Sequence, residues 1–410
     1  MTPCIQPQMT QIAQIAQIAQ IAQIAQMQQP SPRPISAHPC YLCYLWFLLL
    51  IFCVRGAHAQ WLPAAPGWQY EFPRDHQPHR DFKTEWWYFT GNVHTPEGRR
   101  FGYQLTFFRQ GLRPPGTRKP VTSRFIVDDL QFAHFALTDV QPRRFHFFQK
   151  LSRGAFGEAG TGGAPPRLAW IDDWQLTVPA PDTFDLAASG PTATLQLRLI
   201  PAKPWAIHGI AGISQKADGP GRASHYYSGT RLTTTGTLRV EGREFAVEGE
   251  SWFDHEWASN QLTPDQAGWD WFSLQFADGT ELMLYQLRLK AGAGRDTDHG
   301  VDPNSSATFI ARDGTTTHLP RAAYTLRPLT TWKSPTNGAL YPLTWELTVP
   351  SLQLTARITT PVENQELTLA PIAYWEGLVD VAGTRAGTPL RGHGYMELTG
   401  YAGALVGLAE

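Results

Sequence analysis

The chain has 410 residues and carries 34 lysines and arginines against 35 aspartates and glutamates, which gives a formal net charge of -1. Because lysines and arginines are not in excess, the composition does not indicate a basic surface for DNA or RNA, so we exclude nucleic acid as a partner. Aromatic residues make up 12% of the sequence, which also contains 36 glycines and 33 prolines. This mixture favours β-strands and turns over helix bundles.

Residues 1–59 have the features of a leader. Residues 11–26 repeat Ile-Ala-Gln, a low-complexity run, and Met27 offers an alternative start. A short basic stretch, the apolar run 41–54 and an Ala-His-Ala site follow, which together predict a secretory signal peptide cleaved before Gln60. The apolar run is shorter than the roughly 20 residues of a bilayer-spanning helix, but an uncleaved leader would anchor the protein to the membrane.

All cysteines of the chain lie in this leader, namely Cys4, Cys40, Cys43 and Cys53. The mature chain therefore forms no disulfide and offers no thiolate ligand or cysteine nucleophile. Its length of about 350 residues is sufficient for two domains.

Short strand-like runs recur along the mature chain, and no long segment has helical apolar spacing. The clearest runs are Glu85–His94, Arg100–Phe108, Leu130–Leu137 and Ala193–Leu199. Many such runs joined by tight turns predict an all-β protein, built as an antiparallel sandwich or an up-and-down barrel.

Three more pairs of runs are joined by tight X-Gly turns, at Glu241-Gly242, Asp278-Gly279 and Asp313-Gly314. A pair such as Asp-Gly favours the type I′ hairpin, because both central residues need positive φ. The polar stretch 258–267 predicts a linker between a domain at 60–257 and a second domain at 268–410.

The most informative segment is Gly249–Trp257, in which Asp254, His255 and Glu256 stand between Trp252 and Trp257. Burying such charges costs several kcal/mol unless they pair, bind metal or take part in chemistry. On a strand, Asp254 and Glu256 face one side and His255 and Trp257 face the other. The alternatives are a hydrogen-bonded seam between domains, a catalytic or ligand-contacting group, and a metal site.

Metal is the least supported alternative, because no His-x-x-x-His or His-Glu-x-x-His motif is present, and we predict no metal and no cofactor. Two further segments offer ligand-binding candidates: Glu85, Trp87 and Tyr88 in the first, and His225 and Tyr227 in the second. Each could equally be structural, as barrel-plugging aromatics or a hydrogen-bonded histidine. The chain also lacks the G-x-S-x-G, P-loop and Rossmann patterns, which argues against a serine hydrolase or a nucleotide enzyme.

Six motifs resemble, in order, the AttH family of secreted lipocalin-like proteins, which is distantly similar to carotenoid 1,2-hydratases. They are Lys83–Tyr88, His225–Ser228, Gly249–Trp257, Gly268–Phe272, Glu281–Tyr285 and Tyr374–Gly377. The resemblance covers residues 69–401 and implies two tandem lipocalin-like (calycin) antiparallel β-barrel domains. It also implies an apolar ligand and, through an ABC exporter as partner, a periplasmic location.

Two functions follow as expectations. The first is an exported carrier for a lipid or isoprenoid, working beside an ABC exporter or in lipid metabolism. The second is a hydratase- or hydrolase-type enzyme that uses Asp254, His255 and Glu256 as acid and base. His255 and Trp257 match a His-x-Trp pair of the hydratases, and Tyr285 matches a tyrosine of theirs, but Leu287 stands where those enzymes carry an acid. Trp252 and Tyr285 complete the predicted ligand-binding residues.

Overall fold

The computed structural model describes residues 60–118, 126–291, 300–368 and 373–403. The predicted signal peptide and all four cysteines lie outside these described residues. Among the described residues the helices are single 3-10 turns, and none has the length or apolar character to cross a membrane. They are η1 (Arg74–His76), η2 (Pro115–Thr117), η4 (Arg321–Ala323) and η5 (Pro350–Leu352).

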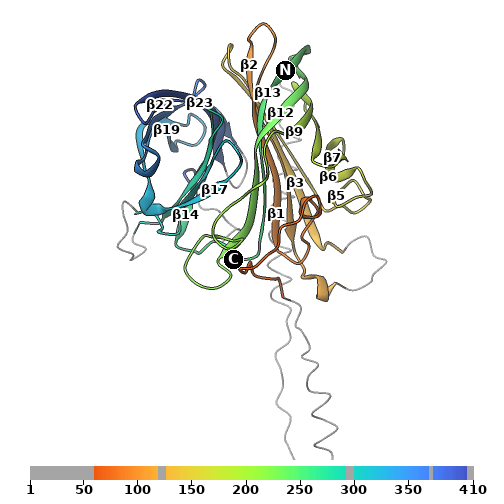
Figure 1. Ribbon diagram of the computed structural model, residues 1–410. Coiled ribbons are helices and arrows are strands. Elements are labelled where there is room, and N and C mark those ends of the chain that lie inside the picture. Colours follow the sequence, from red (N-terminus) through yellow and green to blue (C-terminus); the bar gives the residue numbers. More distant parts are fainter. Residues whose placement is uncertain (1–59, 119–125, 292–299, 369–372, 404–410) are drawn as a thin grey trace, which may run out of the picture. The chain divides into compact units, whose positions relative to one another are not determined.

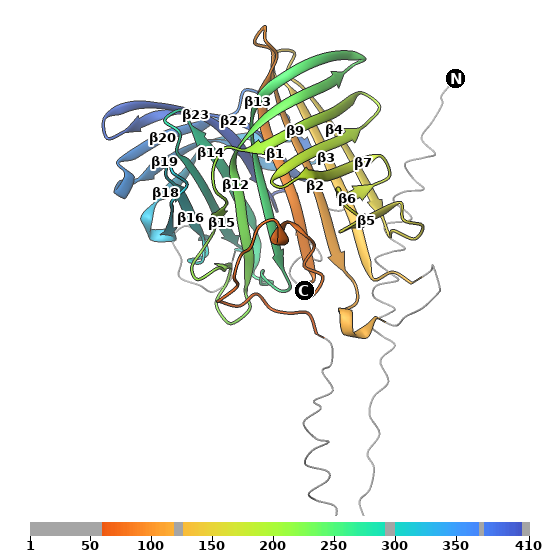
Figure 2. The ribbon, with the colours of Figure 1, turned by 45° about the vertical axis from the view of Figure 1, so that its right-hand side comes forward.

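The first sheet has 13 strands in the order β4-β3-β2-β1-β13-β12-β9-β8-β7-β6-β5, with β10 and β11 paired to β12 (Figure 1). Figure 2 shows β1, β2 and β3 side by side in this sheet. The strand bounds are β1 (Thr84–His94), β2 (Arg100–Gly111), β3 (Asp129–Asp139), β4 (Arg144–Ser152), β5 (Ala159–Thr161), β6 (Arg167–Ile171), β7 (Trp174–Ala180), β8 (Thr183–Ser189), β9 (Ala193–Pro201), β10 (Ala206–Ile207), β11 (Ser214–Gln215), β12 (Ala223–Val240) and β13 (Arg243–Ala258).

The second sheet has 10 strands in the order β17-β16-β15-β14-β23-β22-β20-β19-β18, with β21 paired to β22. The strand bounds are β14 (Gln266–Phe276), β15 (Glu281–Leu289), β16 (Ser306–Ile310), β17 (Thr316–Pro320), β18 (Thr325–Lys333), β19 (Leu340–Val349), β20 (Leu354–Thr359), β21 (Glu366–Leu367), β22 (Tyr374–Arg385) and β23 (Thr388–Leu398).

These two antiparallel sheets form two lipocalin-like domains, one a nearly closed barrel and the other a half-barrel. The all-β prediction and the predicted lipocalin-like architecture are therefore confirmed. The last strand of the first sheet ends at Ala258, and the first strand of the second sheet begins at Gln266.

The three predicted hairpins form with tight turns, but only one has the two-residue type I′ turn. Glu241 and Gly242 have φ values of 50° and 76° and join β12 directly to β13, as a type I′ turn requires. At the other two turns the aspartate side chain bonds the chain two residues on. Asp278 Oδ1 accepts from the Thr280 amide at 3.1 Å, and Asp313 Oδ1 from the Thr315 amide at 2.9 Å. This local bonding favours longer loops.

Buried apolar side chains form three clusters. One fills the concave side of the first sheet and includes Trp87, Tyr227 and Trp257, and a second fills the other barrel. The third draws residues from both sheets, among them Tyr88, Trp252, Trp271 and Tyr285. The third cluster therefore packs one sheet against the other.

Candidate functional site

The central strand β13 presents its ionisable residues to two different environments. It pairs with β1 on one side and β12 on the other, which places Tyr88 and Ser228 directly opposite Asp254. His255 and Trp257 lie with the core of the first sheet, whereas Trp252 belongs to the cluster between the sheets. The alternation predicted for this strand is confirmed, so Asp254 and Glu256 do not share a site with His255.

Between the sheets, Asp254 is almost fully buried, with 3% exposure. Its Oδ2 accepts from the Tyr226 hydroxyl at 2.7 Å, and its Oδ1 accepts from Trp252 Nε1 at 2.6 Å and from the Ser228 hydroxyl. Burial raises the pKa of Asp254 to about 7, although these three donors act in the opposite direction. The carboxyl is thus poised to gain or lose a proton near neutral pH.

Glu256 lies on the same face of β13 and forms an ion pair with Lys216, Oε1 to Nζ 3.2 Å. Lys216 also lies over the ring of Tyr285 at 4.0 Å. Burial alone would lower the pKa of Lys216, but the charge of Glu256 and the Tyr285 hydroxyl raise it. The negative charge of Glu256 contributes in turn to the raised pKa of Asp254.

The second sheet contributes two further acids, the buried Glu376 on β22 and the partly exposed Glu397 on β23, which stand directly opposite each other. Glu397 accepts from Trp269 Nε1 at 3.0 Å, yet burial raises its pKa to about 7, and Asp254 and Glu256 add to the shift. Burial also raises the pKa of Glu376 well above its usual range, and the charge of Glu397 raises it further. We call Asp254, Glu256, Glu376 and Glu397 the acid cluster.

Aromatic groups border the acid cluster. Trp271 lies opposite both Tyr285 and Glu397, and its Nε1 donates to the Tyr226 hydroxyl at 3.1 Å. The Tyr88 hydroxyl and Glu376 Oε1 lie close enough to interact, yet within the described residues neither completes a hydrogen bond of ordinary geometry. Buried groups of this kind offer anchoring points for a polar group of a ligand.

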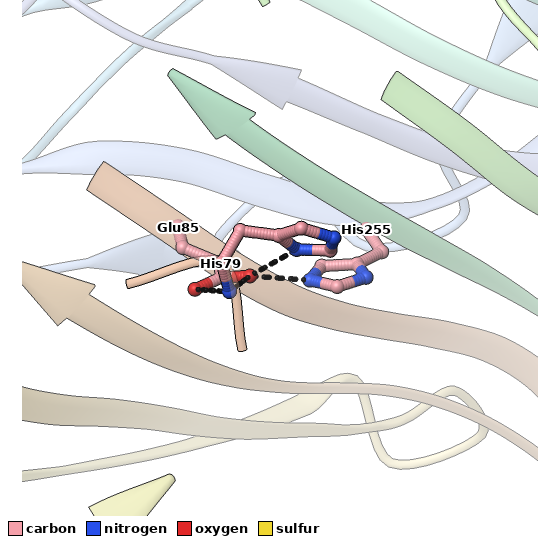
Figure 3. A group of neighbouring side chains, drawn as sticks. All are labelled: His79, Glu85 and His255. Carbon is pink, nitrogen blue, oxygen red and sulfur yellow. Dashed lines mark hydrogen bonds and ion pairs between the residues drawn. The ribbon is translucent and has the colours of Figure 1, made fainter. Parts of the chain in front are cut away.

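A second group of ionisable residues lies within the first sheet, and we call it the inner cluster: Asp75, His79, Glu85, Arg109 and His255. Glu85 and Arg109 are both 0% exposed, and Arg109 Nε donates to Glu85 Oε2 at 3.0 Å. Glu85 Oε1 lies 2.9 Å from His79 Nδ1 and 3.0 Å from His255 Nε2 (Figure 3).

Opposite charges in the inner cluster stabilise one another. Burial alone would raise the pKa of Glu85, but His255, His79 and Arg109 lower it below its usual range. Burial would lower the pKa of His79, but Asp75 and Glu85 together raise it. For His255 burial prevails, and its pKa falls to about 4.

The other predicted residues divide between the two places. Trp87 stacks on His255 at 4.8 Å, Trp257 stacks on His79 at 3.6 Å, and Tyr227 contacts His255. His225 packs beside Trp257. Tyr88, Trp252 and Tyr285 lie between the sheets. The predicted catalytic and ligand-binding residues are thus divided between two sites.

Sequence reasoning missed His79, Asp75 and Arg109 in the inner cluster, and Glu376 and Glu397 in the acid cluster. The two glutamates had a signal, because each sits beside aromatic residues in a strand-like run, as Glu85 and Glu256 do. The segment that carries Asp75 and His79 has no strand periodicity, and nothing in its pattern indicates that it lies beside β1.

The fold and the acid cluster define a two-domain, lipocalin-like protein with ionisable groups buried between its sheets. Residues 63–401 match the model of the AttH-like family, so the chain belongs to that family. The crystal structure of an AttH-type protein from Nitrosomonas europaea is 34% identical, covers 83% of this chain and 99% of its own, and superposes with a TM-score of 0.72.

A more distant likeness concerns the fold alone. The structure of kievitone hydratase from Nectria haematococca is 16% identical, covers 82% of this chain and 93% of its own, and gives a TM-score of 0.61. A search of curated proteins found no match.

Proposed function

We propose that the protein is an acid–base enzyme of the hydratase type, with Asp254 as proton donor to a largely apolar substrate bound between the sheets. The observation that carries the proposal is the buried carboxyl of Asp254, whose pKa is about 7. A general acid works best when its pKa lies near the working pH, and burial is the usual means of raising a carboxyl group to that value.

Water addition to a C=C bond matches this arrangement. Asp254 gives its proton to one carbon of the double bond, water attacks the other carbon, and the proton released from that water returns to the Asp254 carboxylate. The acid is then regenerated and no co-reactant is needed. Glu256, paired with Lys216, keeps a negative charge beside the site and favours the positive charge that develops on the substrate.

The residues around the acid cluster are suited to bind an apolar substrate that has a polar group at one end. Trp252, Trp271 and Tyr285 offer aromatic surfaces. The Tyr88 hydroxyl and Glu376 would bind a hydroxyl or phenol group of the substrate. The acid that the resemblance places at position 287 is absent, but Glu397 and Glu376 bring carboxyl groups to the same region from the neighbouring strands. The fold is shared with kievitone hydratase, whose name describes water addition.

A second candidate is binding without chemistry, as in a carrier for an isoprenoid or lipid. The aromatic surfaces between the sheets favour this reading, because they would hold such a ligand whether or not Asp254 reacts. If the protein is such a carrier, we expect it to associate with an ABC exporter.

The test is incubation with acyclic isoprenoid alkenes and prenylated phenols in ¹⁸O-labelled water, followed by mass spectrometry of the products. Wild type should incorporate ¹⁸O, and Asp254→Asn should lose roughly 10²- to 10⁴-fold of the rate, the usual contribution of a general acid. The control is Asp185→Asn on β8, where Asp185 pairs with Arg198 far from the acid cluster in sequence and sheet order.

Three results are informative. A loss of rate in Asp254→Asn but not in Asp185→Asn supports the proposed enzyme activity. Equal rates in wild type and Asp254→Asn would contradict the role of Asp254. Stable binding of these compounds in native mass spectrometry without any turnover by wild type would favour the carrier instead.

A further inference from the structure

We propose that His79, Glu85 and His255 form a binding site for one divalent transition-metal ion of the zinc class, inside the first sheet. This site lies on the opposite face of β13 from the acid cluster, and its failure would leave the proposed hydratase function untouched. Its three ligands do not form a single sequence motif, because they come from the loop after η1, from β1 and from β13.

The three side chains converge on one point (Figure 3). Glu85 Oε1 lies 2.9 Å from His79 Nδ1 and 3.0 Å from His255 Nε2, and the candidate ligand atoms all lie within 4.8 Å of one another. Tetrahedral zinc, with bonds of about 2.0–2.1 Å, needs its ligand atoms roughly 3.3–3.4 Å apart. Glu85 Oε1 would have to move a few tenths of an ångström from each imidazole nitrogen to admit the ion, and the two nitrogens lie within 4.8 Å of each other.

The outward-facing atoms of the three ligands already have the partners that orient metal ligands. His79 Nε2 faces Asp75 Oδ1 at 3.3 Å, and His255 Nδ1 faces the Asp75 carbonyl oxygen at 2.8 Å. Glu85 Oε2 accepts from Arg109 Nε at 3.0 Å. Histidines that bind metal almost always donate their second ring N–H to a carboxylate or a backbone carbonyl in this way.

The tautomer of His255 adds an independent argument. A carbonyl oxygen can only accept, so the short contact to Asp75 places the proton of His255 on Nδ1. The lone pair of Nε2 then points at Glu85 Oε1, which is itself an acceptor, at 3.0 Å. A proton on Nε2 or a metal ion relieves the repulsion between these two acceptors, and one metal ion would do so for His79 and His255 together.

The surroundings suit zinc better than calcium or magnesium. Two of the three ligand atoms are imidazole nitrogens, which zinc-class ions prefer, whereas calcium and magnesium take oxygen. Glu85 and Asp75 supply two negative charges, and Arg109 and Arg74 oppose them in part. A surface hollow of about 510 Å³, lined in part by Asp75 and His79, lies at the outer side of the cluster.

Stacked aromatic rings hold the two imidazoles of the site in place. His79 lies parallel to Trp257, with ring centroids 3.6 Å apart and an angle of 5° between the rings. Trp87 stacks on His255 at 4.8 Å. These contacts fix both imidazoles before an ion arrives, which lowers the cost of ordering the ligands.

The test is metal analysis of the protein purified without chelators, followed by titration of the metal-stripped protein with Zn²⁺ and with Co²⁺. We expect one equivalent of metal per chain and the visible absorption of tetrahedral Co²⁺. Asp75→Asn should weaken binding by roughly 10- to 100-fold, as loss of an outer partner does, and His79→Gln and His255→Gln should weaken it more. The matched control is His146→Gln on β4, a buried histidine bonded to Thr192, and it should bind as wild type does.

A folded wild type that neither retains nor binds Zn²⁺ or Co²⁺ would overturn the proposal, and so would equal binding by all four variants. If a ligand variant does not fold, ¹⁵N NMR of the histidine rings in wild type decides the question. Added Zn²⁺ should shift His255 Nε2 and His79 Nδ1 and leave His146 unchanged. A histidine spectrum that does not respond to Zn²⁺ would contradict the site.

Discussion

Asparagine at position 254 should change how the stability of the protein depends on pH. Asn has nearly the shape of Asp and can bond the Tyr226 and Ser228 hydroxyls, but it stays neutral at every pH. Asp254 has 3% exposure, and burial moves its pKa from 3.8 to about 7. A comparison of Asp254→Asn with wild type therefore isolates the free energy linked to this one proton.

The sign follows from the direction of the pKa shift. Because the folded state holds the proton more tightly than the unfolded state, Asp254 adds stability that is fully present below pH 3.8 and is lost as pH rises through about 7. A shift of about three pH units corresponds to about 4 kcal/mol, at 1.36 kcal/mol per unit. Between about pH 4 and pH 8, Asp254→Asn should thus gain about 4 kcal/mol of stability relative to wild type.

Urea denaturation of both proteins at a series of pH values measures this difference. Other groups, such as Glu85 with its lowered pKa, change the stability of both proteins alike and cancel in the comparison. A stability difference that stays constant with pH, or a wild type that gains stability relative to Asp254→Asn as pH rises, would show that the pKa of Asp254 is not raised on folding. Asp185→Asn is the control and should show no such trend.

Three further predictions concern the rate, the inner cluster and the contact between strands β14 and β23. Hydration by wild type should fall as pH rises through about 7, because the donor must be protonated, and a flat pH profile of kcat/KM would contradict this. Arg109→Met should lower the free energy of unfolding by about 3–5 kcal/mol in urea denaturation, because it leaves Glu85 buried without its guanidinium partner. Arg198→Met, which breaks an exposed ion pair, should lower it by less than about 1 kcal/mol. Equal losses of stability in the two variants would contradict this prediction. Gly394→Ala should destabilise by at least about 1–3 kcal/mol, since its Cβ would meet the Ser273 carbonyl oxygen, and an unchanged Tm would show that β14 and β23 are not packed this closely.

Much of the fold could be predicted from the sequence, because strand alternation and turn residues are local signals. The runs from Glu85 and Arg100 form β1 and β2, and Glu241-Gly242 turns β12 into β13. The alternation along β13 correctly separated Asp254 from His255. The turns at Asp278 and Asp313 came out longer than predicted, since their side chains bond the local backbone.

The sites were harder to predict because their members come from distant parts of the chain. Glu397 reaches the region of Asp254 only because β23 joins β14 in a sheet packed on the first one, a relation that no local pattern encodes. His79 reaches Glu85 through an irregular segment next to η1, held by hydrogen bonds from its own amide to the Glu85 carboxylate. The central residues of the two sites could be identified from the sequence, whereas their partners could be identified only from the topology.

The ionisation of Asp254 can be followed directly in the folded protein. ¹³C NMR of aspartate carboxyl carbons, with Asp254→Asn used to assign the signal, follows its titration in the folded protein. We expect a midpoint near pH 7, because burial outweighs the Tyr226, Ser228 and Trp252 donors. A midpoint near 4, the ordinary value of an exposed aspartate, would contradict the role of Asp254 as the proton donor.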